Sequence, residues 1–508
     1  MIPVYKISRE ILEETLKTLE LQTYKNWQAC IVWSDIEDHE GYKWLEGRVK
    51  KDSRFAIKLL EQNGGISENS NKALELASGE FITLLDHDDT LAPWAFFEII
   101  KFLNENPKAD FIYSDKDSIS SSGDIRLNAL FKPEWSPEMM HSVNYPTHLN
   151  VIRRSIIIKI GGWRSSTDGA QDWDLFFRVA EKTSNIFRLP SILYHWRIIP
   201  SSTSSGLSAK PYAAAGQLKA QQDYFLRKKL KASVKRSPEG MFHVEWALNN
   251  KSVDILVYQT SGIDELINSI RKIKELNQEK IHNIYVVSSI SSKINLEEFS
   301  SAFNNKIILF QLKNVNWKNA LEILPLKKIK STLLILDGSF FNISKNLVEE
   351  LCGWTSLHPD IAWTSAIALD TKINEVLEVG RVVNKNNMKY VKSAPFFKGS
   401  SLYSYGWFGG PLWYRNMSAC SPYALAINTK DLFKIFASED YPESNKDDFA
   451  KLCILLSGKN KRGLINPFAR IHFEKDPEEK WINDGFTFHK DPFFHPAFSQ
   501  VNPLRLRQ

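Results

Sequence analysis

A chain of 508 residues is too long for one hydrophobic core, so its length predicts two or three domains. A hydrophobic fraction of 43% and a charged fraction of 24% exclude a disordered chain, and no run approaches the ~20 apolar residues that cross a bilayer. The net charge of +6 comes without any nucleic-acid recognition motif, which argues against DNA or RNA as a partner.

The first part of the chain alternates short apolar strands with amphipathic helices. We expect helices over 7–21, 69–77 and 93–103, and strands over 27–33, 81–85 and 111–114. This alternation predicts an α/β fold with a mostly parallel sheet covered by helices. In such sheets ligands bind at the carboxyl ends of strands, and the run Asp86-His87-Asp88-Asp89 lies at such an end.

A polar helix over 211–231 marks the end of this first domain, and a short strand over 241–248 follows it. A second unit then begins near Val253, with strands over 254–258 and 283–288 around a helix over 264–276. This second start repeats the first at a spacing of about 250 residues, which indicates a tandem duplication of a whole domain. The expected domains are 1–210, a helical and basic linker over 211–250, and 251–508.

Two features bear on where the protein works. Residues 227–236 hold six Lys or Arg and no acid, which indicates either a solvated helix end or attraction to anionic lipids, worth roughly 1 kcal/mol per basic residue. The four cysteines are scattered without a Cys-x-x-Cys pair, which argues against structural zinc or disulfides and fits a reducing cytoplasm. With no secretory signal in the sequence, we expect a cytoplasmic protein, with peripheral contact to the inner face of the cytoplasmic membrane as an option.

The acidic run Asp86-His87-Asp88-Asp89 is the strongest chemical signal. Three carboxylates within four residues repel one another unless a cation or a basic partner neutralises them. A divalent ion such as Mg²⁺ or Mn²⁺, bridging carboxylates to phosphates, is the usual reason for such a run. The alternative is that Asp89 or Thr90 only caps the helix near Pro93, but capping needs one such residue rather than three. The run therefore predicts a metal site.

Three weaker motifs accompany it. The sequence Asn63-Gly64-Gly65-Ile66-Ser67 is by itself a turn signal. Gly169-Ala170-Gln171-Asp172-Trp173-Asp174 precedes an amphipathic helix, so one of its Asp residues is either a helix cap or a catalytic group. His195-Trp196-Arg197 ends an apolar run, where a single His is more often structural than a ligand.

Taken together and in this order, the motifs resemble the inverting glycosyltransferases of family 2 over residues 1 to about 205. These enzymes have the GT-A fold, the Rossmann-like fold of nucleotide-diphospho-sugar transferases. The further markers are Gln22-Thr23-Tyr24, Tyr113-Ser114-Asp115, Phe131-Lys132-Pro133-Glu134-Trp135-Ser136-Pro137, Arg153-Arg154 and Gly161-Gly162-Trp163-Arg164. The sequences of these motifs are similar to those of the O-antigen and rhamnan type of family 2 enzymes, which often carry two such domains in tandem.

The resemblance implies a role for each site residue. Asp88, helped by Asp86, would hold Mn²⁺ or Mg²⁺ on the donor diphosphate, and His195 would approach it from the far side. Asp172 would be the general base that takes the proton of the acceptor hydroxyl. The nucleotide-sugar site would comprise Pro3, Val4, Tyr5, Asp35, Asn63, Asp86 and His87. Asp35 stands here where the family has a base-recognising Asp pair, since the sequence reads Val32-Trp33-Ser34-Asp35.

The implied reaction is metal-dependent, inverting transfer from a nucleotide-diphosphate sugar to a glycan or lipid-linked glycan acceptor, in O-antigen-like surface polysaccharide synthesis. The alternative, from another class, is a non-catalytic pseudoglycosyltransferase that binds nucleotide sugar or glycan as a scaffold. A metal phosphatase or nucleotidyltransferase would need further carboxylates for a two-metal site.

Two departures from the family pattern lead to further expectations. The strand before Pro3-Val4-Tyr5 is nearly absent, so we expect apolar residues upstream of Met1 to complete it. The second half reads Asp337-Gly338-Ser339 at the metal motif and Asn445-Lys446-Asp447-Asp448 at the base motif. We therefore expect a degenerate second domain that keeps the fold and has lost the chemistry.

Overall fold

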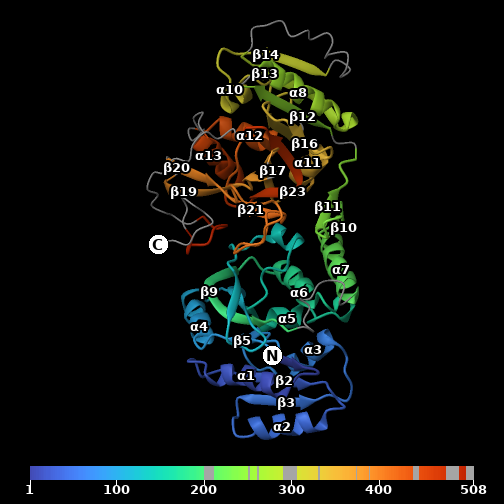
Figure 1. Ribbon diagram of the computed structural model, residues 1–508, viewed down its shortest axis with the longest axis vertical. Coiled ribbons are helices and arrows are strands. Elements are labelled where there is room, and N and C mark those ends of the chain that lie inside the picture. Colours follow the sequence, from blue (N-terminus) through green and yellow to red (C-terminus); the bar gives the residue numbers. More distant parts are fainter. Residues whose placement is uncertain are drawn as a thin grey trace. The chain divides into compact units, whose positions relative to one another are not determined.

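The computed structural model describes residues 1–199, 211–249, 252–259, 262–289, 306–329, 332–372, 375–387, 390–438, 446–475 and 491–498. The chain divides into two compact units (Figure 1). Unit 1 comprises Met1–Trp135, Asn144–Lys229 and Gly406–Phe408, and unit 2 comprises Ser136–Val143, Leu230–Tyr405 and Gly409–Gln508. Across these ranges no helix combines the length and the apolar character that crossing a bilayer requires.

Unit 1 is built on a mixed sheet. Its strands are β1 (Ile2–Val4), β2 (Ala29–Trp33), β3 (Phe55–Leu59), β4 (Phe81–Thr83), β5 (Thr90–Leu91), β6 (Phe111–Ile119), β7 (Arg126–Leu130), β8 (Asn150–Arg153) and β9 (Ile186–Arg197). The strand orders are β3-β2-β1 and β4-β8-β6-β9-β5, with β7 beside β6. The two parts are joined where the Met1 amino group donates to the Thr83 oxygen (2.8 Å) and the Leu85 N–H to the Met1 oxygen (3.0 Å).

The expectation of a mostly parallel sheet holds only in part. Strands β1, β2 and β3 are parallel, and so are β6 and β9. Strand β8, however, enters between β4 and β6 and runs antiparallel to both, and β5 is antiparallel to β9. The long connection after β7 returns the chain to the sheet in the opposite direction, which the β-α rhythm of the first 115 residues could not predict.

Helices cover this sheet as the apolar spacing predicts. They are α1 (Arg9–Glu20), α2 (His39–Val49), α3 (Ile66–Leu76), α4 (Ala95–Glu105), α5 (Arg154–Lys159), α6 (Gln171–Ala180) and α7 (Pro211–Arg227), with a 3₁₀ turn at Ser165–Thr167. In α1 the buried residues Leu12, Leu16 and Leu19 join the core formed around Ile31 and Val151. Helix α7 packs on α6, so it belongs to unit 1 rather than to a linker.

Unit 2 begins with the hairpin β10 (Ala232–Arg236) and β11 (Phe242–Trp246). Its main sheet contains β12 (Val253–Gln259), β13 (Ile281–Ser288), β14 (Ile307–Gln311), β15 (Thr332–Asp337), β16 (Asn342–Ile343), β17 (Ile361–Asp370), β18 (Val376–Glu378), β21 (Arg415–Met417), β22 (Ala424–Asn428) and β23 (Arg462–Phe473). A second hairpin pairs β19 (Arg381–Asn387) with β20 (Tyr390–Pro395). The helices are α8 (Ile263–Lys274), α10 (Trp317–Glu322), α11 (Leu347–Leu357), α12 (Thr429–Phe436) and α13 (Lys446–Ser457), with 3₁₀ turns at Pro137–His141 and Gln278–Lys280.

The two main sheets share one topology. The order in unit 2 is β14-β13-β12-β15-β22-β17-β23-β16, and the order in unit 1 is β3-β2-β1, then β4-β8-β6-β9-β5. The directions also agree at each step: β12, β13 and β14 are parallel, β22 is antiparallel to β15 and β17, β17 and β23 are parallel, and β16 is antiparallel to β23. Even β18 lies antiparallel to β17 as β7 does to β6.

Candidate active site

The acidic run follows β4, where the chain leaves the sheet. Asp86, His87 and Asp88 are half-buried, whereas Asp89 is fully buried. Asp89 accepts hydrogen bonds from the Tyr194 hydroxyl (2.5 Å) and the Arg197 N–H (2.7 Å), both on β9. The fourth residue of the run therefore ties the loop to the sheet, and the first three remain at the surface of the site.

Three carboxylates influence one another here. The pKa of Asp86 is raised to about 7, first by burial and then by the negative charges of Asp88 and Asp172. Asp172 lies in the first turn of α6, 86 residues further along the chain than Asp86. The fold thus brings together the predicted metal-binding and base residues.

Asp172 is held by a short relay of hydrogen bonds. Its Oδ1 accepts from the Trp163 indole N–H (3.2 Å). Trp163 is fixed in turn by Asn71 of α3, which accepts from the Trp163 N–H and donates to its carbonyl oxygen, both at 2.9 Å. Burial raises the pKa of Asp172 to about 6, and the bond from Trp163 opposes that rise.

Asp174, two residues further along α6, has a different role. Its side chain is fully buried and accepts hydrogen bonds from the guanidinium groups of Arg164 and Arg178. The Arg178 Nε lies 2.7 Å from the Asp174 Oδ2. Arg178 also donates to the oxygens of Ile160 and Gly162. Asp174 therefore locks the start of α6 to the preceding loop, while Asp172 faces the site.

His195 is paired with a carboxylate that the sequence did not single out. Its Nδ1 lies 2.6 Å from the Asp117 Oδ1, and Arg126 binds the other Asp117 oxygen at 2.5 Å. The parallel register of β6 and β9 sets Asp117 directly opposite His195. A carboxylate on Nδ1 leaves Nε2 as the ring nitrogen for a metal or phosphate, the arrangement usual for metal-binding histidines.

Two basic side chains near Asp86 were also missed from the sequence. Lys116 lies over the Trp196 ring at 4.4 Å, and burial lowers its pKa to about 8, against the charges of Asp89 and Asp86. His148 stacks on Tyr194 (4.6 Å between ring centroids), and its Nε2 lies 3.8 Å from the Asp86 Oδ2. Burial lowers the pKa of His148, so it is a neutral neighbour of Asp86 at pH 7.

Most of the residues predicted to line the nucleoside are exposed or half-buried. Tyr5 is exposed just after β1, and His87 reaches its backbone; burial lowers the pKa of His87. Asp35 follows the carboxyl end of β2, and Asn63 lies in the loop after β3. The Asn63 side-chain oxygen accepts hydrogen bonds from the Gly65 N–H (3.1 Å) and from the side-chain amide of Asn69 (3.0 Å).

Val4 is the exception among these residues, and Pro3 beside it is also buried. The Val4 side chain is fully buried in the hydrophobic core of unit 1, and its carbonyl oxygen already accepts the Ser34 N–H and hydroxyl, both at 2.9 Å. Successive side chains of a strand point to opposite faces, so Val4 faces the core and not a ligand.

The Asn-Gly-Gly turn opens α3 beside a further acid. Gly65 has a φ of +87°, and a β-carbon there would lie 2.6 Å from the Asp168 carboxylate. Asp168 accepts the Ser67 N–H (3.3 Å) and so satisfies a donor at the start of α3. The glycine is required by the left-handed conformation and by the close approach of Asp168.

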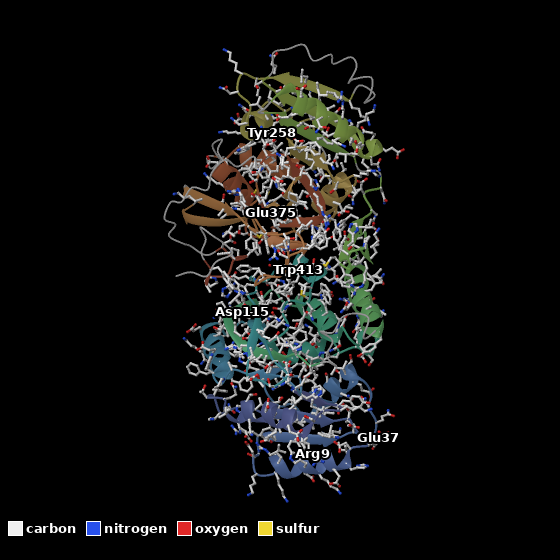
Figure 2. All side chains as sticks on the ribbon, in the orientation of Figure 1. Arg9, Glu37, Asp115, Tyr258, Glu375 and Trp413 are labelled. Carbon is white, nitrogen blue, oxygen red and sulfur yellow. The ribbon has the colours of Figure 1, made fainter. Side chains whose placement is uncertain are left out.

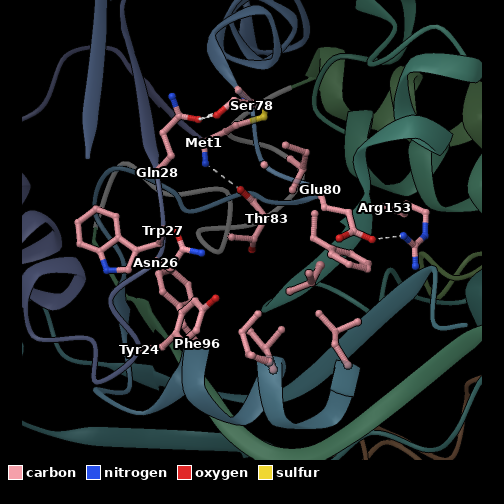
Figure 3. A pocket seen from close by; sticks show the side chains of 18 of the residues that line it. Met1, Tyr24, Asn26, Trp27, Gln28, Ser78, Glu80, Thr83, Phe96 and Arg153 are labelled. Carbon is pink, nitrogen blue, oxygen red and sulfur yellow. Dashed lines mark hydrogen bonds and ion pairs between the residues drawn. The ribbon is translucent and has the colours of Figure 1, made fainter. Parts of the chain in front are cut away.

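A large cavity of unit 1 lies elsewhere (Figure 3). It has a volume of about 600 Å³ and is lined by Met1, Trp27, Gln28 and Phe81 at the amino-terminal ends of β1, β2 and β4, and by Phe96 of α4. None of the predicted site residues lines it. It therefore lies at the opposite ends of the strands from the acidic run.

The donor set of the site fits a divalent cation. Asp86 and Asp88 supply hard oxygen ligands, and His195 has the carboxylate partner that a metal-binding histidine usually has. Among the described residues no three Asp, Glu, His or Cys side chains form a ready-made cage. A cation bound by one or two carboxylates takes its remaining ligands from water and substrate phosphates, so the set is sufficient for a donor diphosphate.

The matching position of unit 2 is Asp337, which ends β15 and is buried; its Oδ1 accepts the Ser339 N–H (2.9 Å) and hydroxyl (2.6 Å). Its Oδ2 lies 3.4 Å from the hydroxyl of Tyr258, a residue labelled in Figure 2, and that hydroxyl also donates to the Pro422 oxygen at 2.9 Å. Asp448 lies half-buried in α13. The predicted Asn445 and the side chains of Lys446 and Asp447 lie outside the described residues.

Residues 1–164 match the family described as "Glycosyl transferase family 2". The uncharacterized protein y4gI of Sinorhizobium fredii is 34% identical over 229 residues, 45% of this chain and 25% of that protein. The O-antigen biosynthesis protein RfbC of Myxococcus xanthus is 29% identical over 232 residues, 46% of this chain and 18% of that protein. The chain thus spans a quarter or less of the length of these relatives.

Among solved structures, S. aureus TarS 1-349 in complex with UDP-GlcNAc is 16% identical, with a TM-score of 0.35 over 44% of this chain and 70% of that one. The family match covers β1 to β8, the acidic run and Trp163. Residues 1–164 are therefore similar in sequence to glycosyltransferase family 2, and the fold of unit 1 is α/β, as the motifs predicted.

Proposed function

We propose that unit 1 moves a sugar from a nucleotide-diphosphate sugar to a glycan hydroxyl, with inversion at the anomeric carbon, in the synthesis of a surface polysaccharide. The observation that carries the proposal is Asp172, a half-buried carboxylate with a pKa of about 6 beside Asp86 in a family 2 domain. Such a group is ionised at neutral pH and still basic enough to take a proton in the transition state.

The step is a single displacement. An acceptor hydroxyl loses its proton to a carboxylate oxygen of Asp172 while its oxygen forms a bond to the anomeric carbon. The bond from that carbon to the donor phosphate oxygen breaks, and its electron pair leaves with the nucleoside diphosphate. The relay from Asn71 through Trp163 fixes the direction of the Asp172 carboxylate, which this geometry requires.

Asp86, Asp88 and the Nε2 of His195 would hold Mn²⁺ or Mg²⁺. When bound, such a cation supplies positive charge against the diphosphate, whose negative charge grows as the bond breaks. Tyr5, Asp35, Asn63 and His87 would line the nucleoside, of which Tyr5 offers an exposed ring.

Lys116 would add a second positive charge near the phosphates. Its side chain is near Asp86 and rests on Trp196, and its pKa of about 8 leaves it mostly protonated at pH 7.

Unit 2 would be a duplicate that has kept the fold and lost the chemistry. Its strand order supports the duplication, and Asp337 supports the loss, because the N–H and the hydroxyl of Ser339 already donate to its Oδ1. A cation would have to displace these bonds, whereas among the described residues no comparable set of hydrogen bonds holds the carboxylates of Asp86 and Asp88.

The test is donor hydrolysis by the purified chain. UDP-, GDP- and dTDP-sugars are supplied with Mn²⁺, and release of the nucleoside diphosphate is compared between the wild type and Asp88→Ala. We expect release from at least one donor by the wild type alone. A donor that raises the melting temperature without being cleaved would instead support the non-catalytic scaffold. Release that is equal in both proteins would contradict the site.

A further inference from the structure

An apolar groove on unit 2 shares no lining residue with the candidate site or with the large cavity of unit 1. It has a volume of about 420 Å³ and lies between the segment after α10 and the helix α12. Its apolar lining comes from Leu324, Pro325, Leu326, Phe433 and Phe436. Phe433 is 41% exposed, which is unusual for so large an apolar side chain beside further apolar surface.

Helix α12 is amphipathic, which explains the groove. Thr429 and Leu432 are buried against unit 2, while Phe433 and Phe436 turn toward the groove. Lys430 and Lys434 occupy the remaining, exposed positions. Aromatic residues beside one face and lysines on the other are typical of helices that lie in a membrane interface.

The rim of the groove is basic. Lys327 and Lys328 are exposed on it, and the Lys327 ammonium lies 5.8 Å from the Phe433 ring centroid. Within the described residues, neither lysine has an acidic side chain at ion-pair distance, and the same holds for Lys430.

The acids nearby are already neutralised. Asp431 binds Lys461 at 2.7 Å and Lys434 at 3.5 Å, and Glu322 lies 3.9 Å from Lys318. Counted over the described residues, this surface therefore keeps a net positive charge around its apolar lining.

We propose that this face docks on an anionic lipid surface. Its lysines meet headgroup phosphates while Leu326, Phe433 and Phe436 enter the acyl boundary, a depth of roughly 5–10 Å for such elements. The charge is complementary to anionic lipid. The groove lining consists of five apolar residues, two lysines and one acid, Glu322. The inference does not depend on the catalytic proposal.

This face replaces the basic run 227–236 as the membrane contact. In that run Arg227 binds Glu181 at 2.8 Å, Lys235 binds Glu245 at 2.5 Å, and Arg236 packs on Phe242. Half of the basic groups of the run are thus engaged within the protein, and no exposed aromatic groove accompanies the rest in the part that the structure describes.

The experiment is co-sedimentation of the full chain with vesicles of equimolar phosphatidylglycerol and phosphatidylcholine, or of phosphatidylcholine alone. We expect binding to the anionic vesicles, weakened as salt rises from about 0.1 to about 1 M. Each lysine near the surface contributes about fivefold, so Lys327→Glu with Lys328→Glu should weaken binding by at least about 25-fold. Phe433→Ser should weaken it by about tenfold.

The matched control is Lys228→Glu with Lys229→Glu, the same charge change at exposed positions of the basic run. It should bind as the wild type does. Equal loss in both double variants, or binding that Phe433→Ser leaves unchanged, would overturn the assignment. So would the absence of vesicle binding by the wild type. Thermal melts that match the wild type verify that each variant is folded.

Discussion

Replacing Asp172 by Asn should make unit 1 more stable and far less active. The carboxylate has a folded pKa of about 6 against a reference value of 3.8, a difference of about 2.2 units. At 1.36 kcal/mol per unit, the ionised group costs the fold about 3 kcal/mol at pH 7. Asn keeps the acceptor for the Trp163 indole but has no charge to bury.

The sign of the pH dependence follows from the raised pKa. Below pH 3.8 the carboxyl is protonated in both the folded and the unfolded states, and it costs nothing. The cost grows between pH 3.8 and about 6 and is constant above. Losing a negative charge in the first turn of α6 returns up to about 1 kcal/mol, so the net gain of the Asn variant at pH 7 is about 2 kcal/mol.

The assay is thermal unfolding of the metal-free chain at pH 7 and at pH 4, together with the transfer rate. A gain of about 2 kcal/mol corresponds to roughly 4–8 °C in the transition of unit 1, and it should vanish near pH 4. The rate should fall by roughly 100-fold or more.

The control is Asp174→Asn, two residues away on the same helix. Breaking a buried pair with Arg164 and Arg178 should destabilise the unit by about 3–5 kcal/mol. An Asp172→Asn variant that melts lower than the wild type at pH 7 and retains its rate would refute the role of Asp172.

Three further outcomes are expected. Chelation should abolish donor hydrolysis and added Mn²⁺ should restore it, whereas full activity in excess chelator would remove Asp88 from the site. Asp117→Asn should weaken Mn²⁺ binding by about 10–100-fold, measured as the Mn²⁺ concentration for half-maximal hydrolysis, because it loosens the His195 ring; an unchanged value would leave Asp117 as a partner of Arg126 alone. Asp337→Ala should leave transfer within about twofold of the wild type, and loss of one of two linkages made by the wild type would show that unit 2 is a second active transferase.

Much of unit 1 could be predicted from its sequence because local signals there agree with the fold. The apolar spacing predicted α1, and Asp86 lies at a strand end as the α/β rhythm indicated. The convergence of Asp86 with Asp172 followed from the family resemblance, since no local pattern links residues so far apart.

The site contacts that the sequence did not indicate depend on strand register and on irregular connections. Asp117 meets His195 only because β6 and β9 pair in parallel at one particular offset, across 78 residues of chain. His148 approaches Asp86 from the connection before β8, which has no periodic pattern of its own. The burial of the Val4 side chain in the core is consistent with strand alternation, because the side chains of β1 point alternately to its two faces.

The shared strand order of the two units has a consequence for how the chain reaches its native state. Every strand of unit 1 has an equivalent in the main sheet of unit 2, in the same order and direction, so a fully unfolded chain can form hybrid sheets. Synthesis reduces this competition, because β9 ends at Arg197 and β12 begins only at Val253, so translation at ~5–20 residues per second gives the complete first sheet on the order of 3–10 s to close before β12 is made. When the full-length chain refolds from denaturant, all strands are present at once, and we therefore expect misassembled species with hybrid sheets to form.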